Sequence, residues 1–154
     1  MIKTINGDVR EPIGDGTKFI CHCVNDQKRM GSGVALALLQ KWSRVRSEYM
    51  DWDKYGKFAL GNIQVVWVEY DIAVINMVGQ HDIVAKDGIP PIRYDAMKSC
   101  LEKVYSIAKR DNASVHIPKR CGSDRAGGDW NIIEKMIIEE LSDKNINVVI
   151  YDFK

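Results

Sequence analysis

The chain has 154 residues, of which 45% are hydrophobic, and its 22 lysines and arginines nearly balance its 21 acidic residues to give a net charge of +1. This length suits one domain with a core of its own and is too short for two, so residues 1–154 are predicted to form a single domain. The near-neutral charge argues against nucleic acid as a partner, so an anionic ligand must be bound by local features. The chain has no apolar run long enough for a bilayer and no signal peptide, which predicts a cytoplasmic protein without membrane attachment.

The cysteines are expected to be free thiols in a reducing compartment. Cys21-His22-Cys23 has the residue types of a metal site. On a strand, however, the two sulfur atoms share one face and the imidazole points to the other. Cys21, Cys23, Cys100 and Cys121 are therefore predicted to act as small buried side chains, and neither a metal nor a cofactor is predicted.

In the first half of the chain, short β-rich runs surround two helical segments. Strands are predicted over residues 2–6 and 17–24, before and after a turn that is rich in glycine. Helical spacing follows over residues 34–42, and a second amphipathic helix is predicted from 43 to 54. Two further β-rich runs, 63–68 and 72–78, are predicted to pair as an antiparallel hairpin.

In the second half, helices separate the strands. Residues 79–92 contain two prolines and several charges, which is typical of a long exposed loop that is often functional. A helix is predicted over 94–108, and another begins near Trp130 with Asp129 as its N-cap. Buried strands are predicted over 114–117 and 147–151. The pattern indicates an α/β domain in which helices cover both faces of a mixed sheet of about six strands.

The first candidate site is the loop between residues 24 and 34. It follows a strand, contains Gly31 and Gly33, and leads into a helix. Glycines without a Cβ let a ligand approach the backbone, and the N–H groups of a first helical turn bind anions. A Gly-x-Gly sequence beside a helix is also found in ordinary turns. A second loop of the same design, residues 121–129, favours the ligand-binding interpretation, with pyrophosphate as the expected ligand.

With both loops placed, the chain resembles a macro domain, the fold that binds ADP-ribose, over nearly its whole length. The resemblance implies a three-layer α/β/α fold and a monomer. The matching motifs are Gly7-Asp8-Val9, Asn25 at the end of a strand, and Gly31-Ser32-Gly33-Val34-Ala35. His22-Cys23, Arg29-Met30-Gly31 and Gly122-Ser123-Asp124-Arg125 are most similar to the branch that contains terminal ADP-ribose protein glycohydrolase and the ADP-ribose-1″-phosphatases.

The resemblance implies a set of ligand-binding residues. Asp8 and the N–H of Val9 would recognise adenine, Phe153 would lie against its ring, and Asn25 would hold the distal ribose. A capped surface turn for Asp8, a core aromatic for Phe153 and a turn-forming Asn25 are the structural alternatives. The diphosphate would lie between the two loops. The residues implied there are Gly31, Ser32, Gly33, Val34, Cys121, Gly122, Ser123, Asp124 and Arg125.

The resemblance also implies catalytic residues. Asp124 would be the general base or would position water at the distal ribose, although a carboxylate that only pairs with Arg125 is the alternative. His22 could transfer a proton, or could be a buried structural histidine. The glycohydrolase branch uses a lysine just after the fourth-strand region, where residues 76–81 contain none. Lys86 lies in the following loop and could reach the site only if this loop folded back.

These residues predict a hydrolase that binds ADP-ribose and acts on its distal ribose, with ADP-ribose-1″-phosphate as the preferred substrate. The expected partners are ADP-ribose, its derivatives and ADP-ribosylated proteins. The enzymatic alternative is removal of ADP-ribose from carboxylates, or of the acyl group from O-acetyl-ADP-ribose. The alternative from another class is a non-catalytic ADP-ribose-binding module.

Overall fold

The computed structural model describes residues 1–123 and 126–153, which form one mixed β-sheet with helices on both faces. All neighbouring strands are parallel except β3, which pairs with β4 in the opposite direction. The predicted six-stranded α/β architecture and the antiparallel hairpin are therefore confirmed. In their order across the sheet, the strands are β1 (Ile2–Asn6), β6 (Val148–Asp152), β5 (Ser114–Pro118), β2 (Lys18–Asn25), β4 (Ile72–Gln80) and β3 (Ile63–Glu69).

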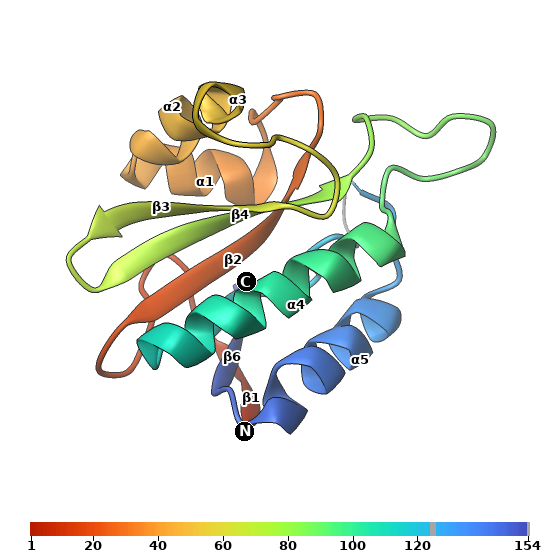
Figure 1. Ribbon diagram of the computed structural model, residues 1–154. Coiled ribbons are helices and arrows are strands. Elements are labelled where there is room, and N and C mark those ends of the chain that lie inside the picture. Colours follow the sequence, from red (N-terminus) through yellow and green to blue (C-terminus); the bar gives the residue numbers. More distant parts are fainter. Residues whose placement is uncertain (124–125, 154) are drawn as a thin grey trace.

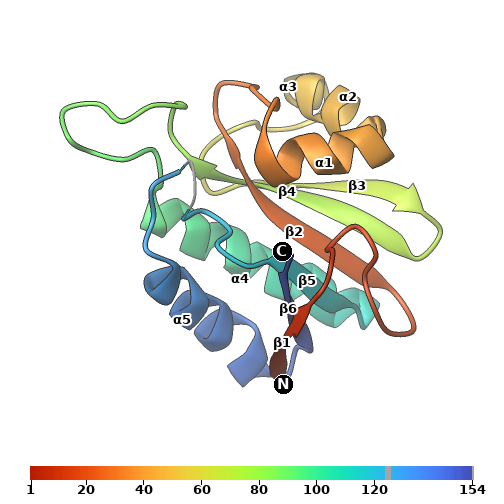
Figure 2. The ribbon, with the colours of Figure 1, turned by 180° about the vertical axis from the view of Figure 1, so that it is seen from behind.

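The helices complete three layers, as Figures 1 and 2 show from opposite sides. Among the described residues, no helix is both long and apolar enough to cross a membrane. One face of the sheet carries α1 (Gly33–Lys41), α2 (Arg44–Met50) and α3 (Trp52–Tyr55), and the other carries α4 (Tyr94–Asp111) and α5 (Trp130–Glu140), which is followed by the short 3₁₀ helix η1 (Ser142–Lys144).

The central strand β2 is buried on both faces, and its side chains alternate between two cores. Phe19 and Cys21 belong to the core under α4 and α5, whereas Ile20 and Val24 belong to the core under α1 and α2. His22 lies between Ile20 and Val24 in the alternation, so it faces the α1 and α2 side. The prediction that the histidine and the flanking cysteines point to opposite faces is confirmed.

One predicted helix start is confirmed, and one predicted helix is interrupted. Asp129 caps α5 as predicted, because its side chain accepts a hydrogen bond from the backbone N–H of Asn131. The helix predicted over residues 43–54 is interrupted. At Asp51 the backbone takes φ −96° and ψ 3°, outside the helical region, so α2 ends there and the short α3 begins.

A buried hydrogen-bond chain joins β5, β6 and the loop after β1. His116 is fully buried, and its two ring nitrogens lie 2.7 Å from the Ser114 hydroxyl and 2.6 Å from the Tyr151 hydroxyl. The same Tyr151 oxygen accepts a hydrogen bond from the backbone N–H of Ile13. Burial lowers the pKa of His116 to about 4, with a further contribution from the charge of Lys18. The imidazole is thus neutral in the folded protein at neutral pH.

We expect His116→Gln to reduce the acid sensitivity of the fold. A histidine with a pKa near 6.5 when unfolded and about 4 when folded contributes stability above pH 6.5 that is lost as the pH falls towards 4. Between pH 6 and 5, this histidine should account for about 1 kcal/mol of unfolding free energy per pH unit. The unfolding free energy of the variant, measured with urea at several pH values, should therefore change less steeply with pH, by about this amount. Equal slopes for variant and wild type would contradict the assignment.

Candidate functional site

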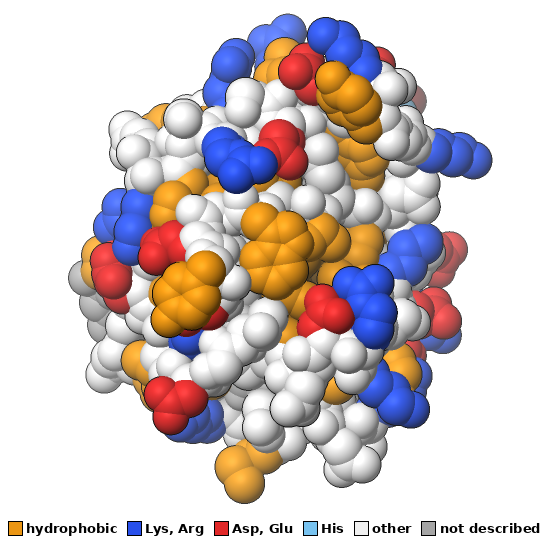
Figure 3. Space-filling view, turned by 60° about the vertical axis from the view of Figure 1, so that its left-hand side comes forward, with side chains coloured by type: hydrophobic (Ala, Val, Ile, Leu, Met, Phe, Trp, Pro, Cys, Tyr) orange, Lys and Arg blue, Asp and Glu red, His pale blue; other side chains and the backbone are white. Residues whose placement is uncertain are grey.

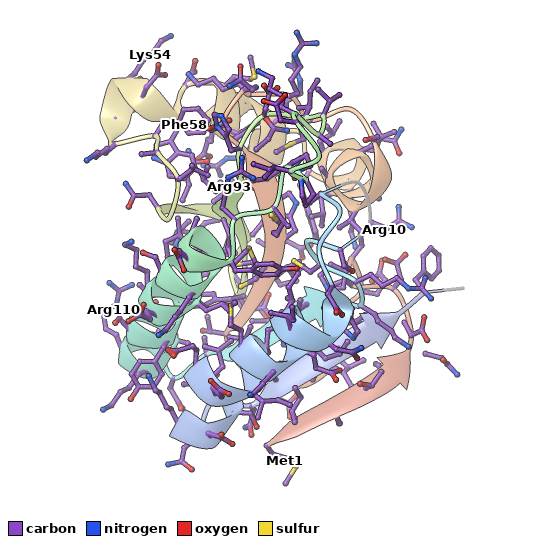
Figure 4. The ribbon with its side chains drawn as sticks, turned by 90° about the vertical axis from the view of Figure 1, so that its right-hand side faces the viewer. Met1, Arg10, Lys54, Phe58, Arg93 and Arg110 are labelled. Carbon is purple, nitrogen blue, oxygen red and sulfur yellow. The ribbon has the colours of Figure 1, made fainter. Side chains whose placement is uncertain are left out.

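The carboxyl ends of β5, β2 and β4 lie side by side at one edge of the sheet, and the loops that follow them surround a cavity of about 850 Å³. Figure 4 looks onto this edge. In α/β sheets, ligands bind at the carboxyl ends of the strands. The first loop, residues 26–32, and the second loop, residues 119–129, both contribute to the cavity wall, as does Ile83 of the loop after β4.

Asn25 holds the first loop in shape. Its side-chain oxygen accepts hydrogen bonds from the backbone N–H groups of Gln27 and Arg29, and its amide nitrogen donates to the Arg29 carbonyl at 2.7 Å. The hydroxyl of Tyr49, which lies on α2, donates a hydrogen bond of 2.5 Å to the backbone carbonyl oxygen of Asn25. The Asn25 side-chain oxygen and one of its two amide N–H groups thus shape the loop, the role given by the turn-forming alternative for this residue.

The amino end of α1 faces the cavity without a cap. Ser32, the N-cap residue, makes no side-chain capping bond, and the first turn of α1 contains no acidic residue. Among the described residues, no group accepts a hydrogen bond from the backbone N–H of Ser32, Gly33 or Val34. All three residues line the cavity. Unpaired N–H groups at a helix start, reinforced by the helix dipole, form a binding site for an anion.

The two loops contain glycine for different structural reasons. A Cβ at Gly31 or Gly33 would meet no atom within 4 Å, so the backbone there is open to a ligand. A Cβ at Gly122 would lie 2.9 Å from Ile133 and 3.1 Å from Ile92, and φ is +74°. The second loop therefore needs glycine to pack against α5, whereas the first loop exposes its backbone.

The described side chains that line the cavity carry positive charge only. They include five cations and no carboxylate: Lys28, Arg29, Arg46, Lys119 and Arg120. Lys28 pairs with Asp53, and Lys119 lies 3.5 Å from Asp152. The guanidinium groups of Arg29, Arg46 and Arg120 have no hydrogen-bond or ion-pair partner among the described residues. Guanidinium groups bind phosphate oxygens in a bidentate manner, so the cavity favours a phosphorylated ligand.

Elsewhere, charges of both signs are mixed. On the face shown in Figure 3, basic and acidic side chains lie interspersed around a group of apolar side chains. A second hollow of about 630 Å³ beside α2 and β3 follows this pattern, because Arg44, Lys57 and Lys103 share it with Glu48 and Asp51. Arg44 and Glu48 also pair with each other. The second hollow therefore has no single charge that would select an anion, and the cavity at the strand ends is the stronger candidate.

Known structures share this fold. A macrodomain protein from Streptomyces coelicolor is 33% identical, with 99% of both chains covered and a TM-score of 0.82. The chain belongs to the macrodomain family. A protein from Bacteroides thetaiotaomicron is similar over 99% of this macrodomain and 98% of its own chain, at 44% identity and a TM-score of 0.94.

More distant relatives share the fold. Thermosipho africanus DarTG, whose structure is a complex with ADP-ribose, is 17% identical and has a TM-score of 0.71 over 88% of this macrodomain and 38% of its own chain. Chromodomain-helicase-DNA-binding protein 1-like of Danio rerio is 29% identical over 99% of the macrodomain. The macrodomain spans 16% of that relative, about one sixth of its length. No protein-family model matches the chain.

The macrodomain fold brings most of the described candidate residues together. The cavity is lined by residues from β2, from both loops and from the start of α1, in agreement with the predicted meeting of the two loops. The predicted residues on its wall are His22, Asn25, Gly31, Ser32, Gly33, Val34, Cys121 and Gly122.

Four described candidate residues lie off the cavity wall: Asp8, Val9, Ser123 and Phe153. Asp8 accepts hydrogen bonds from the guanidinium and the backbone N–H of Arg10, and the guanidinium bonds hold the pKa of Asp8 below its usual range. Val9 is buried in the core, and Phe153 is 68% exposed. The backbone N–H of Ser123 donates to the Arg120 carbonyl at 2.8 Å, so it is not free for a ligand.

His22 lies on the cavity wall but is only 2% exposed. Its Nε2 is 2.5 Å from the side-chain oxygen of Asn76, which is completely buried on β4. Burial lowers the pKa of His22 to about 4, although the hydrogen bond with Asn76 acts in the opposite direction. At neutral pH, His22 is therefore a neutral imidazole that can accept a proton but has no extra proton to give.

The remaining candidates are Asp124, Arg125 and Lys86. Asp124 and Arg125 lie outside the described residues, whereas Gly122 and Ala126 on either side line the cavity. Lys86 is in the exposed loop after β4, where it pairs with Asp82 at 2.8 Å and does not line the cavity.

Sequence reasoning missed the contact that joins the first loop to the loop after β4. Asp26 lies 2.7 Å from His81 Nδ1 and accepts a hydrogen bond from the backbone N–H of Asp82. Burial raises the pKa of Asp26, but the bonds from Asp82, His81 and Gln27 outweigh it and lower the pKa overall. Sequence reasoning also missed the cavity arginines that have no partner among the described residues. One of them, Arg46, lies on α2, the second helix after the glycine loop.

Proposed function

We propose that this macrodomain binds ADP-ribose with the diphosphate against the first loop. The observation that carries the proposal is the meeting of two features: the N–H groups of Ser32, Gly33 and Val34 have no partner among the described residues, and the charged side chains among the described cavity residues are all positive. A diphosphate matches both features. The shared fold of Thermosipho africanus DarTG, which was solved with ADP-ribose, supports the choice of ligand.

For the reaction, we propose hydrolysis of ADP-ribose-1″-phosphate to ADP-ribose and phosphate. Such a reaction requires a bound phosphate and a positioned water molecule. Arg29, Arg46 and Arg120 offer more cationic groups than one diphosphate needs, which suits a ligand with a further phosphate. Asp124 is the proposed residue that positions or deprotonates the water, and His22 would assist as a neutral acceptor.

Lysine chemistry receives no support from the described residues. Lys28 and Lys119 line the cavity, but each already pairs with an aspartate, and Lys86 is held by Asp82. Lys86→Ala should therefore keep most of the turnover. Borohydride treatment with substrate should give no adduct by mass spectrometry, and an adduct at Lys86 would instead favour glycohydrolase chemistry.

Calorimetry with ADP-ribose and phosphate release from ADP-ribose-1″-phosphate test the proposal together. We expect ADP-ribose to bind and phosphate to be released. Binding without release from the phosphate ester, from O-acetyl-ADP-ribose or from an ADP-ribosylated carboxylate would identify a non-catalytic binding module. Release only from the acyl substrates would identify a deacylase. If ADP-ribose does not bind, the proposed ligand is wrong.

The adenine end of the ligand is tested at Asp8. We expect Asp8→Ala to weaken ADP-ribose by about 1–3 kcal/mol, the usual cost of leaving a buried hydrogen-bonding partner unpaired. Affinity for ribose-5-phosphate, which lacks adenine, should be unchanged. Arg10→Ala is the matched control, because it removes the guanidinium partner of Asp8 and leaves the carboxylate bonded only to the backbone N–H of residue 10. Equal losses for both ligands would show that Asp8 only holds its own turn.

A further inference from the structure

A row of polar side chains crosses strands β2, β4 and β3 beneath the cavity. His22 on β2 is in register with Asn76 on β4, and Asn76 is in register with Gln64 on β3. The other residues of β4 between positions 72 and 79 are apolar. A buried amide without partners destabilises the fold, so such a row persists only when its members are fully paired. His22 ends the row at the cavity, and Gln64 ends it at the second hollow.

The direction of each hydrogen bond in the row is fixed from its far end. The Glu48 carbonyl on α2 can only accept, so the Gln64 amide nitrogen, 2.8 Å away, points towards it. The Gln64 side-chain oxygen then faces Asn76, whose amide nitrogen donates to it at 3.0 Å. The Val45 carbonyl, 3.4 Å from the same nitrogen, reinforces this orientation. The Asn76 oxygen is thereby left facing His22.

The hydrogen bond to His22 therefore requires a proton on Nε2. The Asn76 oxygen is an acceptor, and it lies 2.5 Å from Nε2. A neutral imidazole carries one proton, so Nδ1 is left as an acceptor.

The Nδ1 atom is open to the cavity. In the part of the chain that the structure describes, no completely buried side-chain nitrogen or oxygen lacks a hydrogen-bond partner. Nδ1 of His22 has no hydrogen-bond partner among these described residues. His22 has its free surface on the cavity wall.

We propose that Asn76 and Gln64 are positioning residues that hold His22 in the Nε2–H tautomer and so present Nδ1 to the cavity as a hydrogen-bond acceptor. Its partner on the ligand is a hydroxyl group of the distal ribose, a part of the inference that rests on the proposed function. Because the Asn25 side-chain oxygen already accepts hydrogen bonds from the first loop, His22 Nδ1 supplies an acceptor from β2 itself.

The tautomer can be measured in the ligand-free protein by ¹⁵N NMR of the histidine rings at pH 7.5. The chain has only three histidines, so His81→Gln and His116→Gln assign the His22 signals. We expect a protonated Nε2 and an unprotonated Nδ1. Asn76→Leu should abolish the single tautomer, whereas Asn76→Asp, which keeps an oxygen towards Nε2, should retain it. A protonated Nδ1 in the wild type overturns the inference.

Gln64→Met provides a test that removes neither His22 nor its direct partner. The variant deletes the acceptor that orients Asn76, and position 64 does not line the cavity. We expect part of the His22 population to move to the Nδ1–H form and ADP-ribose affinity to fall about 3- to 10-fold. An unchanged tautomer would overturn the positioning role of Gln64.

Titration with ADP-ribose distinguishes a failure of this inference from a failure of the proposed function. Titration of the wild type with ADP-ribose should shift the Nδ1 resonance of His22, because a ribose hydroxyl then donates to it. If ADP-ribose fails to bind while the Nε2–H tautomer is present, the proposed function is wrong and the tautomer assignment stands. If ADP-ribose binds and Nδ1 does not shift, the assigned contact with ribose is wrong.

Discussion

Gly31→Glu is expected to weaken ADP-ribose binding by at least about 100-fold, which corresponds to ~2.7 kcal/mol. Gly31 lines the cavity, and a side chain there meets no protein atom within 4 Å. The variant should therefore fold normally and place a carboxylate beside the bound diphosphate. Two like charges about 4 Å apart near a protein surface repel by roughly 4 kcal/mol, which is enough for the expected loss.

Gly31→Gln is the matched control, since it adds the same volume without the charge. We expect it to bind ADP-ribose at least tenfold more tightly than Gly31→Glu in calorimetry. Position 33 is less suitable, because φ at Gly33 is +61° and any side chain there would strain the backbone. If both variants at position 31 bind as the wild type does, the diphosphate does not lie against the first loop.

Asp124→Asn is expected to slow phosphate release from ADP-ribose-1″-phosphate by about 10²- to 10⁴-fold, the range typical of losing a general base. ADP-ribose affinity should remain nearly unchanged, because the substitution removes a proton acceptor and keeps the size of the side chain. Single-turnover kinetics and calorimetry on the same preparation measure the two quantities.

Asp129→Asn controls for the chemical change in the same loop. Asp129 caps α5 through its side chain, and asparagine is an equally good N-cap, so this variant should keep its stability and its turnover. Wild-type turnover in Asp124→Asn would assign the base to another residue. An equal loss in both variants would indicate a general effect on the second loop.

The fold was largely predictable because its signals are local. Periodicity identified the strands, and Asp129 marked the start of α5 through the chemistry of its own side chain. The interruption at Asp51 was not predictable, since the apolar pattern continues to Trp52, which is buried beside Phe58. Here a tertiary contact decides where the short α3 lies.

The candidate site was predictable only in outline. The two glycine loops could be placed at the ends of strands, but the hydrogen bonds made by their polar groups depend on tertiary contacts. Pairing of Asp8 with Arg10 and of the Ser123 N–H with the Arg120 carbonyl uses groups that sequence reasoning assigned to a ligand. The row from His22 to Gln64 depends on strand register, which a single sequence does not reveal.

The two glycine loops differ in how much free space lies beside their glycines. A Cβ at position 122 would meet Ile133 and Ile92, so the second loop packs closely against α5 at Gly122. A Cβ at Gly31 or Gly33 would meet no atom within 4 Å, whereas the earlier residues of the first loop are held by the bonds of Asn25, by Asp26 with His81 and by Lys28 with Asp53. Additional ligand volume therefore fits beside Gly31 and Gly33, at the amino end of α1, and not beside Gly122.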